Sequence, residues 1–211
     1  MTIRAVAFDI GSVITQVDPD YFAAIEADFG LTRAEWGPLL HGPEAAEHNM
    51  PAVPWHTEDV VTYFTSVLKP RCGSKAAAAA ERLAGVYVSL DALSPVEGMV
   101  ELLLGLRRAG RPVGLLSNGP VESGSELMPV LLGAALPDVI VLSGSHGVTK
   151  PDREAFEMVA GELRVKLEEC FFVDDQELHV EAARALGMTA HRFQGDPAAL
   201  EAELRAAGMS W

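Results

Sequence analysis

Four short clusters of polar residues in this sequence contain the side chains that could carry out chemistry. They are Asp9–Gly11, Ser117–Gly119, Lys150–Asp152 and the pair Asp174–Asp175. Adjacent carboxylates repel each other, and a bound cation is the usual remedy. Carboxylates, one lysine and hydroxyl or amide donors together suit the binding of Mg²⁺ and a phosphoryl group.

Each cluster also has a simpler explanation when it is considered alone. Asp9 and the pair Asp174–Asp175 could cap helices. Ser117–Gly119 could form an ordinary turn, and Lys150 could be a solvated surface side chain. The catalytic interpretation therefore depends on whether the fold brings the four clusters together.

The elements that would position these clusters are five short apolar runs, each read as a strand: Ile3–Phe8, Pro112–Leu116, Val139–Leu142, Cys170–Val173 and Met188–Phe193. Near-continuous hydrophobicity is typical of parallel strands that helices cover on both faces. Helical patterns lie between the runs, and this alternation predicts an α/β fold with a doubly wound, Rossmann-like parallel sheet. Because the carboxyl ends of such strands gather at one crevice, the four clusters are expected to meet there.

One long stretch interrupts the alternation. From about Gln16 to Leu93 no buried-strand pattern occurs, but helical patterns do: Asp20–Phe29, Thr32–His41, Thr57–Leu68 and Ser74–Ser89. An insertion directly after the first strand would lie over the carboxyl edge of the sheet, where ligands bind. The sequence therefore predicts a core formed by residues 1–15 and 94–211, with a helical cap formed by residues 16–93.

The composition limits the possible partners. Sixteen basic and thirty acidic side chains give a formal net charge of −14. This charge disfavours nucleic acids and anionic membranes, so an anionic substrate would need a local positive centre. Cys72 and Cys170 have no disulfide or metal spacing, and no signal peptide or membrane-spanning run is evident. We expect a cytoplasmic protein, monomeric by default, that acts on a small molecule.

In their order and strand context, the four clusters resemble the four motifs of the haloacid dehalogenase-like hydrolase superfamily. The resemblance covers about residues 2–12 and 95–193 and leaves the predicted cap unmatched. The spacing of Asp9, Gly11 and Val13 is similar to that of a phosphatase branch that includes sugar-1-phosphate phosphatases. The resemblance implies a magnesium-dependent phosphomonoester hydrolase for a small phosphorylated metabolite, such as a sugar 1-phosphate.

The resemblance also assigns a role to each cluster. Asp9 would be the nucleophile and form an aspartyl-phosphate. Lys150 would neutralise phosphoryl oxygens and steady Asp9. Ser117, with the backbone N–H of Asn118, would hold a phosphoryl oxygen. The ligands of Mg²⁺ would be the carboxylates of Asp9, Asp174 and Asp175 and the carbonyl oxygen of Gly11.

The sequence departs from the superfamily pattern at Gly11, where most of these phosphatases have an aspartate that acts as general acid and base. Three hypotheses remain open. The substrate has a leaving group that scarcely needs protonation, such as an anomeric hydroxyl; or the protein binds phosphorylated ligands and turns them over poorly; or the cap supplies the missing group, from His41, His48, His56 or Glu58.

The role of His179 stays open. It lies one helical turn after Asp175, where it either orients the acidic pair or is an ordinary surface histidine.

Two alternative functions also stay open. The enzymatic alternative on the same fold is a metal-independent 2-haloacid dehalogenase. Gly11 and the pair Asp174–Asp175 argue against it, because the first motif of such enzymes is similar to Asp-x-Tyr-Gly-Thr and their fourth motif lacks the paired acids. The alternative from another class is a catalytically weak phosphometabolite-binding or regulatory protein.

Overall fold

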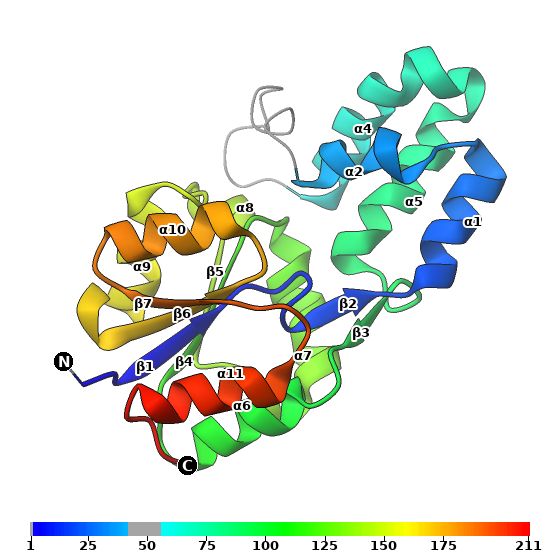
Figure 1. Ribbon diagram of the computed structural model, residues 1–211. Coiled ribbons are helices and arrows are strands. Elements are labelled where there is room, and N and C mark those ends of the chain that lie inside the picture. Colours follow the sequence, from blue (N-terminus) through cyan, green and yellow to red (C-terminus); the bar gives the residue numbers. More distant parts are fainter. Residues whose placement is uncertain (1, 42–55) are drawn as a thin grey trace.

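The computed structural model describes residues 2–41 and 56–211. Its centre is a five-stranded parallel sheet in the order β5-β4-β1-β6-β7 (Figure 1). The strands are β1 (Ala5–Phe8), β4 (Val113–Ser117), β5 (Val139–Leu142), β6 (Cys170–Asp174) and β7 (Thr189–Arg192). Each strand coincides with one of the five apolar runs, so the predicted doubly wound α/β fold is confirmed.

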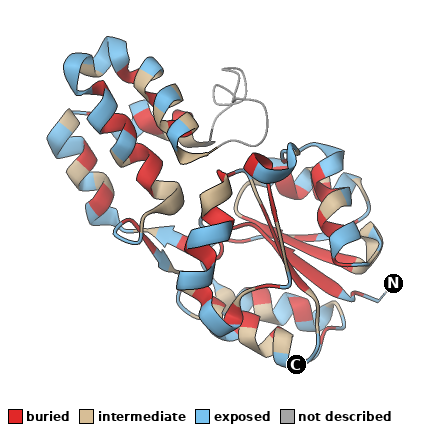
Figure 2. Cartoon of the chain, turned by 180° about the vertical axis from the view of Figure 1, so that it is seen from behind, coloured by how far each residue is buried: buried red, intermediate tan, exposed pale blue. Residues whose placement is uncertain are grey.

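Strands β1, β4, β5 and β6 are mainly apolar because helices cover both faces of the sheet (Figures 1 and 2). Val6 and Phe8 of β1 belong to one cluster of buried side chains, while Ala5 and Ala7 belong to the other. The first cluster includes apolar residues of α6 (Met99–Arg108) and α11 (Pro197–Ala206); the second includes those of α9 (Arg153–Glu162) and α10 (Glu177–Ala185). Alternate residues of a strand point to opposite faces, so both sets must be apolar.

Short helical segments complete this part of the chain. A π-helical turn (Ser123–Leu127) runs into α7 (Met128–Leu132), and α8 (Ser143–His146) follows β5 directly. Single 3-10 turns lie at Gly73–Lys75, Gly133–Ala135 and Leu167–Glu169. Asp196 is the N-cap of α11, because its Oδ1 accepts hydrogen bonds from the N–H groups of Ala198 and Ala199, both at 3.0 Å.

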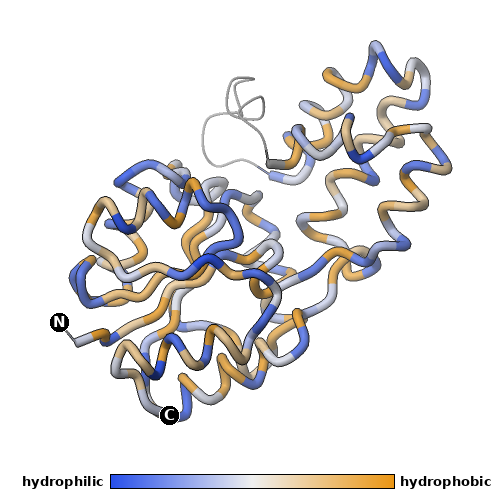
Figure 3. Tube along the Cα trace, viewed as in Figure 1, coloured by the Kyte–Doolittle hydropathy of each residue, from blue (hydrophilic) through white to orange (hydrophobic). Residues whose placement is uncertain are grey.

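Among the described residues, four helices between positions 19 and 88 form a group beside the sheet, which we call the helical insert (residues 19–41 and 56–88). They are α1 (Pro19–Phe29), α2 (Arg33–His41), α4 (Thr57–Cys72) and α5 (Ala76–Val88). Apolar and polar stretches alternate along these helices (Figure 3), and the apolar residues Ile25, Phe64 and Leu83 are buried. All four helices follow the predicted patterns. The division into a core and a cap stays a prediction.

The sequence did not predict the connection between the insert and the sheet. Two three-residue strands, β2 (Thr15–Val17) and β3 (Leu93–Pro95), pair antiparallel at this point. Segments this short carry almost no periodic signal, and β2 has one buried, one exposed and one half-buried residue. Among the described residues, no helix has the length and apolar character needed to cross a membrane.

Candidate active site

The predicted site residues lie at the carboxyl edge of the sheet, on its central strands. Asp9 follows the last residue of β1, and Ser117 and Asp174 end β4 and β6. Strand β1 lies between β4 and β6, and Phe8 is in register with both Leu115 and Val173. The chain reverses its winding at β1, so this edge is the position where open α/β sheets form their ligand site.

Lys150 brings two of the predicted carboxylates together. Its Nζ lies 2.7 Å from Oδ1 of Asp9 and 2.6 Å from Oδ2 of Asp174. The lysine side chain is 1% exposed, and those of Asp9 and Asp174 are 8% and 0% exposed. The alternative that Lys150 is a solvated surface residue is therefore wrong. Charge-assisted hydrogen bonds of this kind are short and strong when water is excluded.

Asn118 positions Lys150 through the main chain, which the sequence did not indicate. Its Nδ2 donates to the carbonyl oxygen of Lys150, and its Oδ1 accepts from the backbone N–H of Lys150, both at 2.9 Å. Ser117 is half-buried next to it, at the end of β4. Gly11 is exposed, and a Cβ atom added to it would meet nothing within 4 Å.

Burial and neighbouring charges shift the pKa values of the three buried groups in different directions. Burial is the largest influence on Asp9 and, with the charge of Asp174, raises its pKa despite Lys150. Burial alone would raise the pKa of Asp174, but Lys150 and His179 outweigh it and lower the pKa. Burial alone would lower the pKa of Lys150, but Asp9 and Asp174 outweigh it and raise the pKa. Lys150 and Asp174 are thus held as a charged pair.

Asp175 completes an acidic cluster. One oxygen each from Asp9, Asp174 and Asp175 lies within 4.8 Å of the other two. Burial, followed by the charges of Asp9 and Asp174, raises the pKa of Asp175 to about 6. Three carboxylates and one ammonium group leave two negative charges without a partner. A divalent cation would balance that charge, and oxygen donors are what hard cations such as Mg²⁺ prefer, so these residues fit such an ion.

His179 belongs to the same buried group. It lies on α10 with 5% of its surface exposed. Its Nδ1 is 3.0 Å from Oδ1 and 3.1 Å from Oδ2 of Asp174. The sequence left open whether this histidine lies on the surface, and the structure places it against the acidic pair.

Of the candidates for the group missing at Gly11, the structure describes two. The side chain of His41 and the whole of His48 lie outside the described residues. Glu58 is exposed. His56, just before α4, has its Nδ1 2.5 Å from Oε1 of Glu122, which lies shortly after Asn118. This contact raises the pKa of His56.

Glu122 connects the helical insert to the sheet part of the chain, and the sequence did not indicate it. Its Oε2 accepts hydrogen bonds from the backbone N–H and the hydroxyl group of Thr57, both at 3.0 Å. Next to it, the hydroxyl group of Ser123 donates to the carbonyl oxygen of Tyr87 at 3.0 Å, at the end of α5. These pairs join residues far apart in sequence, and no local pattern identifies such partners.

We expect Glu122→Ala to loosen the start of α4, because the helix would lose a carboxylate that accepts from its first N–H group. Loss of such a cap costs about 1 kcal/mol, which corresponds to a Tm lower by roughly 2–4 °C for a chain of this size. Hydrogen exchange at residues 57–60 should be faster than in the wild type. Glu126→Ala, at an exposed position of the same segment, is the matched control. Unchanged exchange in Glu122→Ala would contradict the contact.

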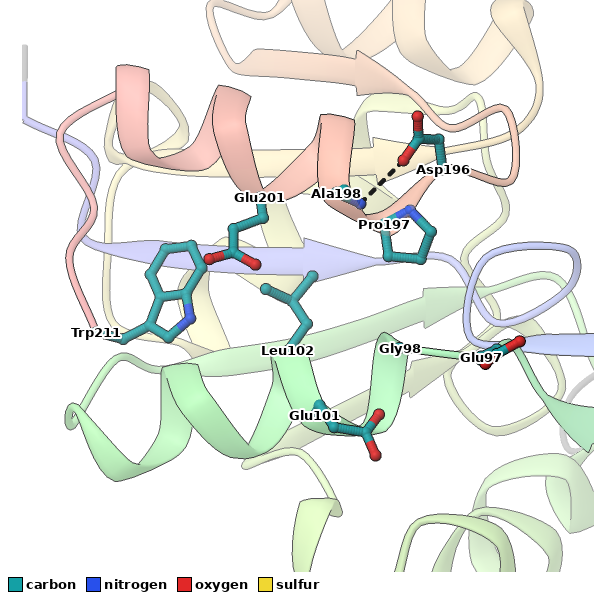
Figure 4. Close-up of a pocket in the computed structure, with 9 residues that line it drawn as sticks. All are labelled: Glu97, Gly98, Glu101, Leu102, Asp196, Pro197, Ala198, Glu201 and Trp211. Atoms are coloured by element: carbon teal, nitrogen blue, oxygen red, sulfur yellow. Dashed lines mark hydrogen bonds between the residues drawn. The ribbon is translucent and has the colours of Figure 1, made fainter.

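Two surface grooves lie away from this cluster. One, of about 650 Å³, lies near the start of β4 and is lined by Arg107, Arg108 and Arg111. The other, of about 440 Å³, separates α6 from α11 and ends at Trp211 (Figure 4). Of its four acidic residues, Asp196 caps α11 and Glu201 pairs with Arg205 at 2.7 Å. Neither groove contains a member of the Asp9 cluster.

Several known proteins resemble all or part of this chain. The model of the haloacid dehalogenase-like hydrolase family matches residues 3–187. Phosphatase MT3486 from Mycobacterium tuberculosis (strain CDC 1551 / Oshkosh) is 30% identical over 204 residues, which cover 90% of this chain and 87% of that protein. Sesquiterpene phosphatase astK from Aspergillus oryzae is 34% identical over 96 residues, or 46% of this chain and 49% of that protein.

Among solved structures, a haloacid dehalogenase family enzyme from Bacteroides thetaiotaomicron in complex with magnesium and inorganic phosphate has the same fold. The TM-score is 0.67 at 19% identity, and the match covers 94% of this chain and 98% of the other. At this identity the likeness shows the fold alone.

Proposed function

The chain belongs to the haloacid dehalogenase-like hydrolase family, and we propose that it is a magnesium-dependent phosphatase that hydrolyses the phosphomonoester of a small metabolite. The observation that carries this proposal is the position of Lys150, buried between Asp9 and Asp174 with Asp175 beside them. The M. tuberculosis relative is named a phosphatase, which supports the same reaction.

In the proposed reaction Asp9 attacks phosphorus, the ester P–O bond breaks, and an aspartyl-phosphate forms while the alcohol leaves as an oxyanion that takes a proton from solvent. Lys150 contacts Oδ1 of Asp9, so Oδ2 is the oxygen left for attack. Water then attacks phosphorus, the bond to Asp9 breaks, and inorganic phosphate leaves. Dividing one displacement in this way replaces a difficult step with two easier ones.

The other proposed roles follow from charge and position. Lys150 neutralises the phosphoryl oxygens, and the hydroxyl group of Ser117 with the backbone N–H of Asn118 holds one of them. Asp9, Asp174, Asp175 and the carbonyl oxygen of Gly11 would hold Mg²⁺. When bound, the ion supplies the positive charge that lets an anionic nucleophile approach an anionic phosphate.

We propose that residues 16–93 act as a cap over this site, with residues 1–15 and 94–211 as the core. The helical insert supports this division, because its described helices form one group connected through β2 and β3. The contacts of Glu122 and Ser123 would hold the cap from the loop that follows the phosphate-binding residues. Substrate selection would then depend largely on the insert.

Hydrolysis of p-nitrophenyl phosphate with and without magnesium is the direct test of the reaction. We expect turnover that EDTA abolishes and added Mg²⁺ restores, with release of stoichiometric inorganic phosphate. Folded protein that binds Mg²⁺ but hydrolyses none of a panel of phosphomonoesters would overturn the proposal in favour of a binding role. Halide release from a 2-haloacid without metal would instead identify a dehalogenase.

Binding of Mg²⁺ should strengthen as the pH rises through about 6. The pKa of Asp175 is raised to about 6, and a ligand carboxylate must lose its proton before it binds metal. Below that pH, the apparent affinity should fall roughly tenfold per pH unit for one released proton. In the protein without metal, the pH dependence of folding stability has the opposite sign. The raised pKa of Asp175 contributes stability that is present below the pKa of the unfolded chain and is lost as the pH rises through 6. Calorimetric titration and melting curves from pH 5 to 8 measure both trends, and a pH-independent affinity would contradict the first.

We propose that the substrate has a good leaving group, such as the anomeric oxygen of a sugar 1-phosphate. This accounts for Gly11, because a weakly basic leaving group scarcely needs a general acid. A sugar 1-phosphate should then be a better substrate than its 6-phosphate isomer. A sesquiterpene monophosphate belongs in the same panel, because one relative is named a sesquiterpene phosphatase. Equal rates for the two sugar isomers would remove the leaving-group argument.

Gly11→Asp tests whether the missing general acid limits the reaction, by changing the protein instead of the substrate. The position is exposed and has open space for a Cβ atom, so the substitution should be tolerated. An added general acid should raise the rate on an alkyl phosphate by about 10²-fold and change the rate on p-nitrophenyl phosphate little. Gly161→Asp, on α9 and equally open, is the matched control. An unchanged ratio of the two rates would show that protonation of the leaving group does not limit the reaction.

A further inference from the structure

The buried histidine of α10 has a contact that the proposed reaction does not yet use. His179 is 5% exposed, and its Nδ1 lies 3.0 and 3.1 Å from the two oxygens of Asp174. An ionised carboxylate only accepts hydrogen bonds, so Nδ1 of His179 must carry the proton and donate it. The contact reaches both oxygens and thereby restrains the plane of the carboxylate.

Asp174 depends on such partners because it is fully buried. Its Oδ2 accepts from Nζ of Lys150 at 2.6 Å, and its Oδ1 accepts from the backbone N–H of Gln176 at 2.9 Å. A buried carboxylate is costly unless charges and hydrogen bonds compensate it. Lys150 and His179 are the two described side chains that hold Asp174, so loss of either leaves its orientation to the other side chain and the N–H of Gln176.

A continuous line of contacts therefore runs from His179 to the proposed nucleophile. Nδ1 of His179 holds Asp174, Asp174 holds Nζ of Lys150, and the same Nζ lies 2.7 Å from Oδ1 of Asp9. If Asp174 turned, the ammonium group would lose one of its two acceptors and shift relative to Asp9. Displacements of about 1 Å at a reacting group cost roughly 10²-fold in rate.

We propose that His179 is a positioning residue, which fixes Lys150 against Asp9 by donating its Nδ1 proton to Asp174. The residue touches no reacting atom. Its effect passes through the orientation of the carboxylate. The inference rests on the proposed phosphatase reaction for its catalytic readout, and a second readout needs no turnover.

Asparagine and glutamine distinguish the two nitrogens of the histidine. The side-chain NH₂ group introduced by His179→Asn takes a place near that of Nδ1, whereas the NH₂ group introduced by His179→Gln lies near that of Nε2; His179→Leu keeps bulk and removes every donor. We expect His179→Asn to keep kcat within about threefold, and His179→Gln and His179→Leu to lose roughly 10–100-fold, as is usual for residues that orient a catalytic group. KM for p-nitrophenyl phosphate should change less than kcat. His191→Leu, at a histidine paired with Glu203 at 2.9 Å, is the control and should keep wild-type kcat.

Melting curves for each variant separate positioning from folding. A kcat in His179→Leu equal to that of the wild type would overturn the proposal. So would a loss in His179→Asn as large as in His179→Leu when both proteins are equally stable, because the donor at Nδ1 would then be irrelevant.

The readout without turnover is the histidine ¹H–¹⁵N spectrum of the protein. We expect a protected proton on Nδ1 of His179 that is lost or strongly shifted in Asp174→Asn. If the wild type hydrolyses no phosphomonoester but this signal is present, the proposed function fails while the contact stands. If the wild type is active and Nδ1 carries no proton, the positioning role fails while the proposed function stands.

Discussion

Asp9→Asn should leave a folded protein with no measurable magnesium-dependent turnover. The amide has the shape of the carboxylate but lacks its negative charge, so it is a poor nucleophile towards phosphorus. Removal of a catalytic nucleophile costs about four orders of magnitude or more in kcat. Lys150 would keep Asp174 as a charged partner, so the substitution should not unfold the protein.

The measurement is kcat for p-nitrophenyl phosphate, combined with acid quenching of the reaction with a ³²P-labelled substrate. The wild type should trap label on Asp9, and the variant should trap none. Asp28→Asn, at an exposed position of α1, is the matched control and should retain wild-type activity. Turnover that survives in Asp9→Asn would mean that another group attacks phosphorus.

Lys150→Met should damage both activity and stability. Methionine fills similar space without charge, so Asp9 and Asp174 would face each other as buried carboxylates without their shared cation. Removing one partner of a buried ion pair costs about 3–5 kcal/mol. Loss of the proposed phosphate-neutralising charge should lower kcat by roughly 10²–10³-fold, as for other groups that stabilise a transition-state anion.

The stability defect of Lys150→Met should depend on pH with a definite sign. In the wild type the lowered pKa of Asp174 contributes stability that is present above the unfolded pKa and is lost as the pH falls through the folded value. In the variant, burial without the lysine would raise the pKa of this carboxyl. This carboxyl would then contribute stability only at low pH, and the contribution would be lost as the pH rises. The difference in unfolding free energy should therefore be larger at pH 7 than at pH 4.5.

Urea unfolding at these two pH values measures the effect. Lys166→Met is the matched control, because its side chain is 75% exposed and its ion pair with Glu168 is 3.8 Å long. It should change stability by less than about 0.5 kcal/mol. Equal midpoints for Lys150→Met and the wild type at pH 7 would contradict the buried pairing.

The sequence by itself determined the fold class and the neighbourhood of the site. Short apolar runs without alternation are typical of strands covered on both faces, and all five runs became strands of the parallel sheet. Parallel strands bring their carboxyl ends to one edge, so the convergence of Asp9, Lys150 and Asp174 could be expected without coordinates. The helices of the insert were equally predictable, because their apolar periodicity is local.

Only the tertiary structure decided which of these side chains touch. Lys150 contacts Asp9 across 141 positions of sequence and Asp174 across 24, and its burial depends on elements that pack from both sides. The amide of Asn118 against Lys150, Glu122 at the start of α4 and the short β2–β3 pair carry no periodic signal. His179 could equally have faced solvent, since a helix of given sequence can be rotated about its axis. Hydrophobic periodicity depends on residues close in sequence, and it determines which elements form and their order along the chain. Hydrogen bonds between distant residues depend on distances of about 3 Å, which only the packed chain sets.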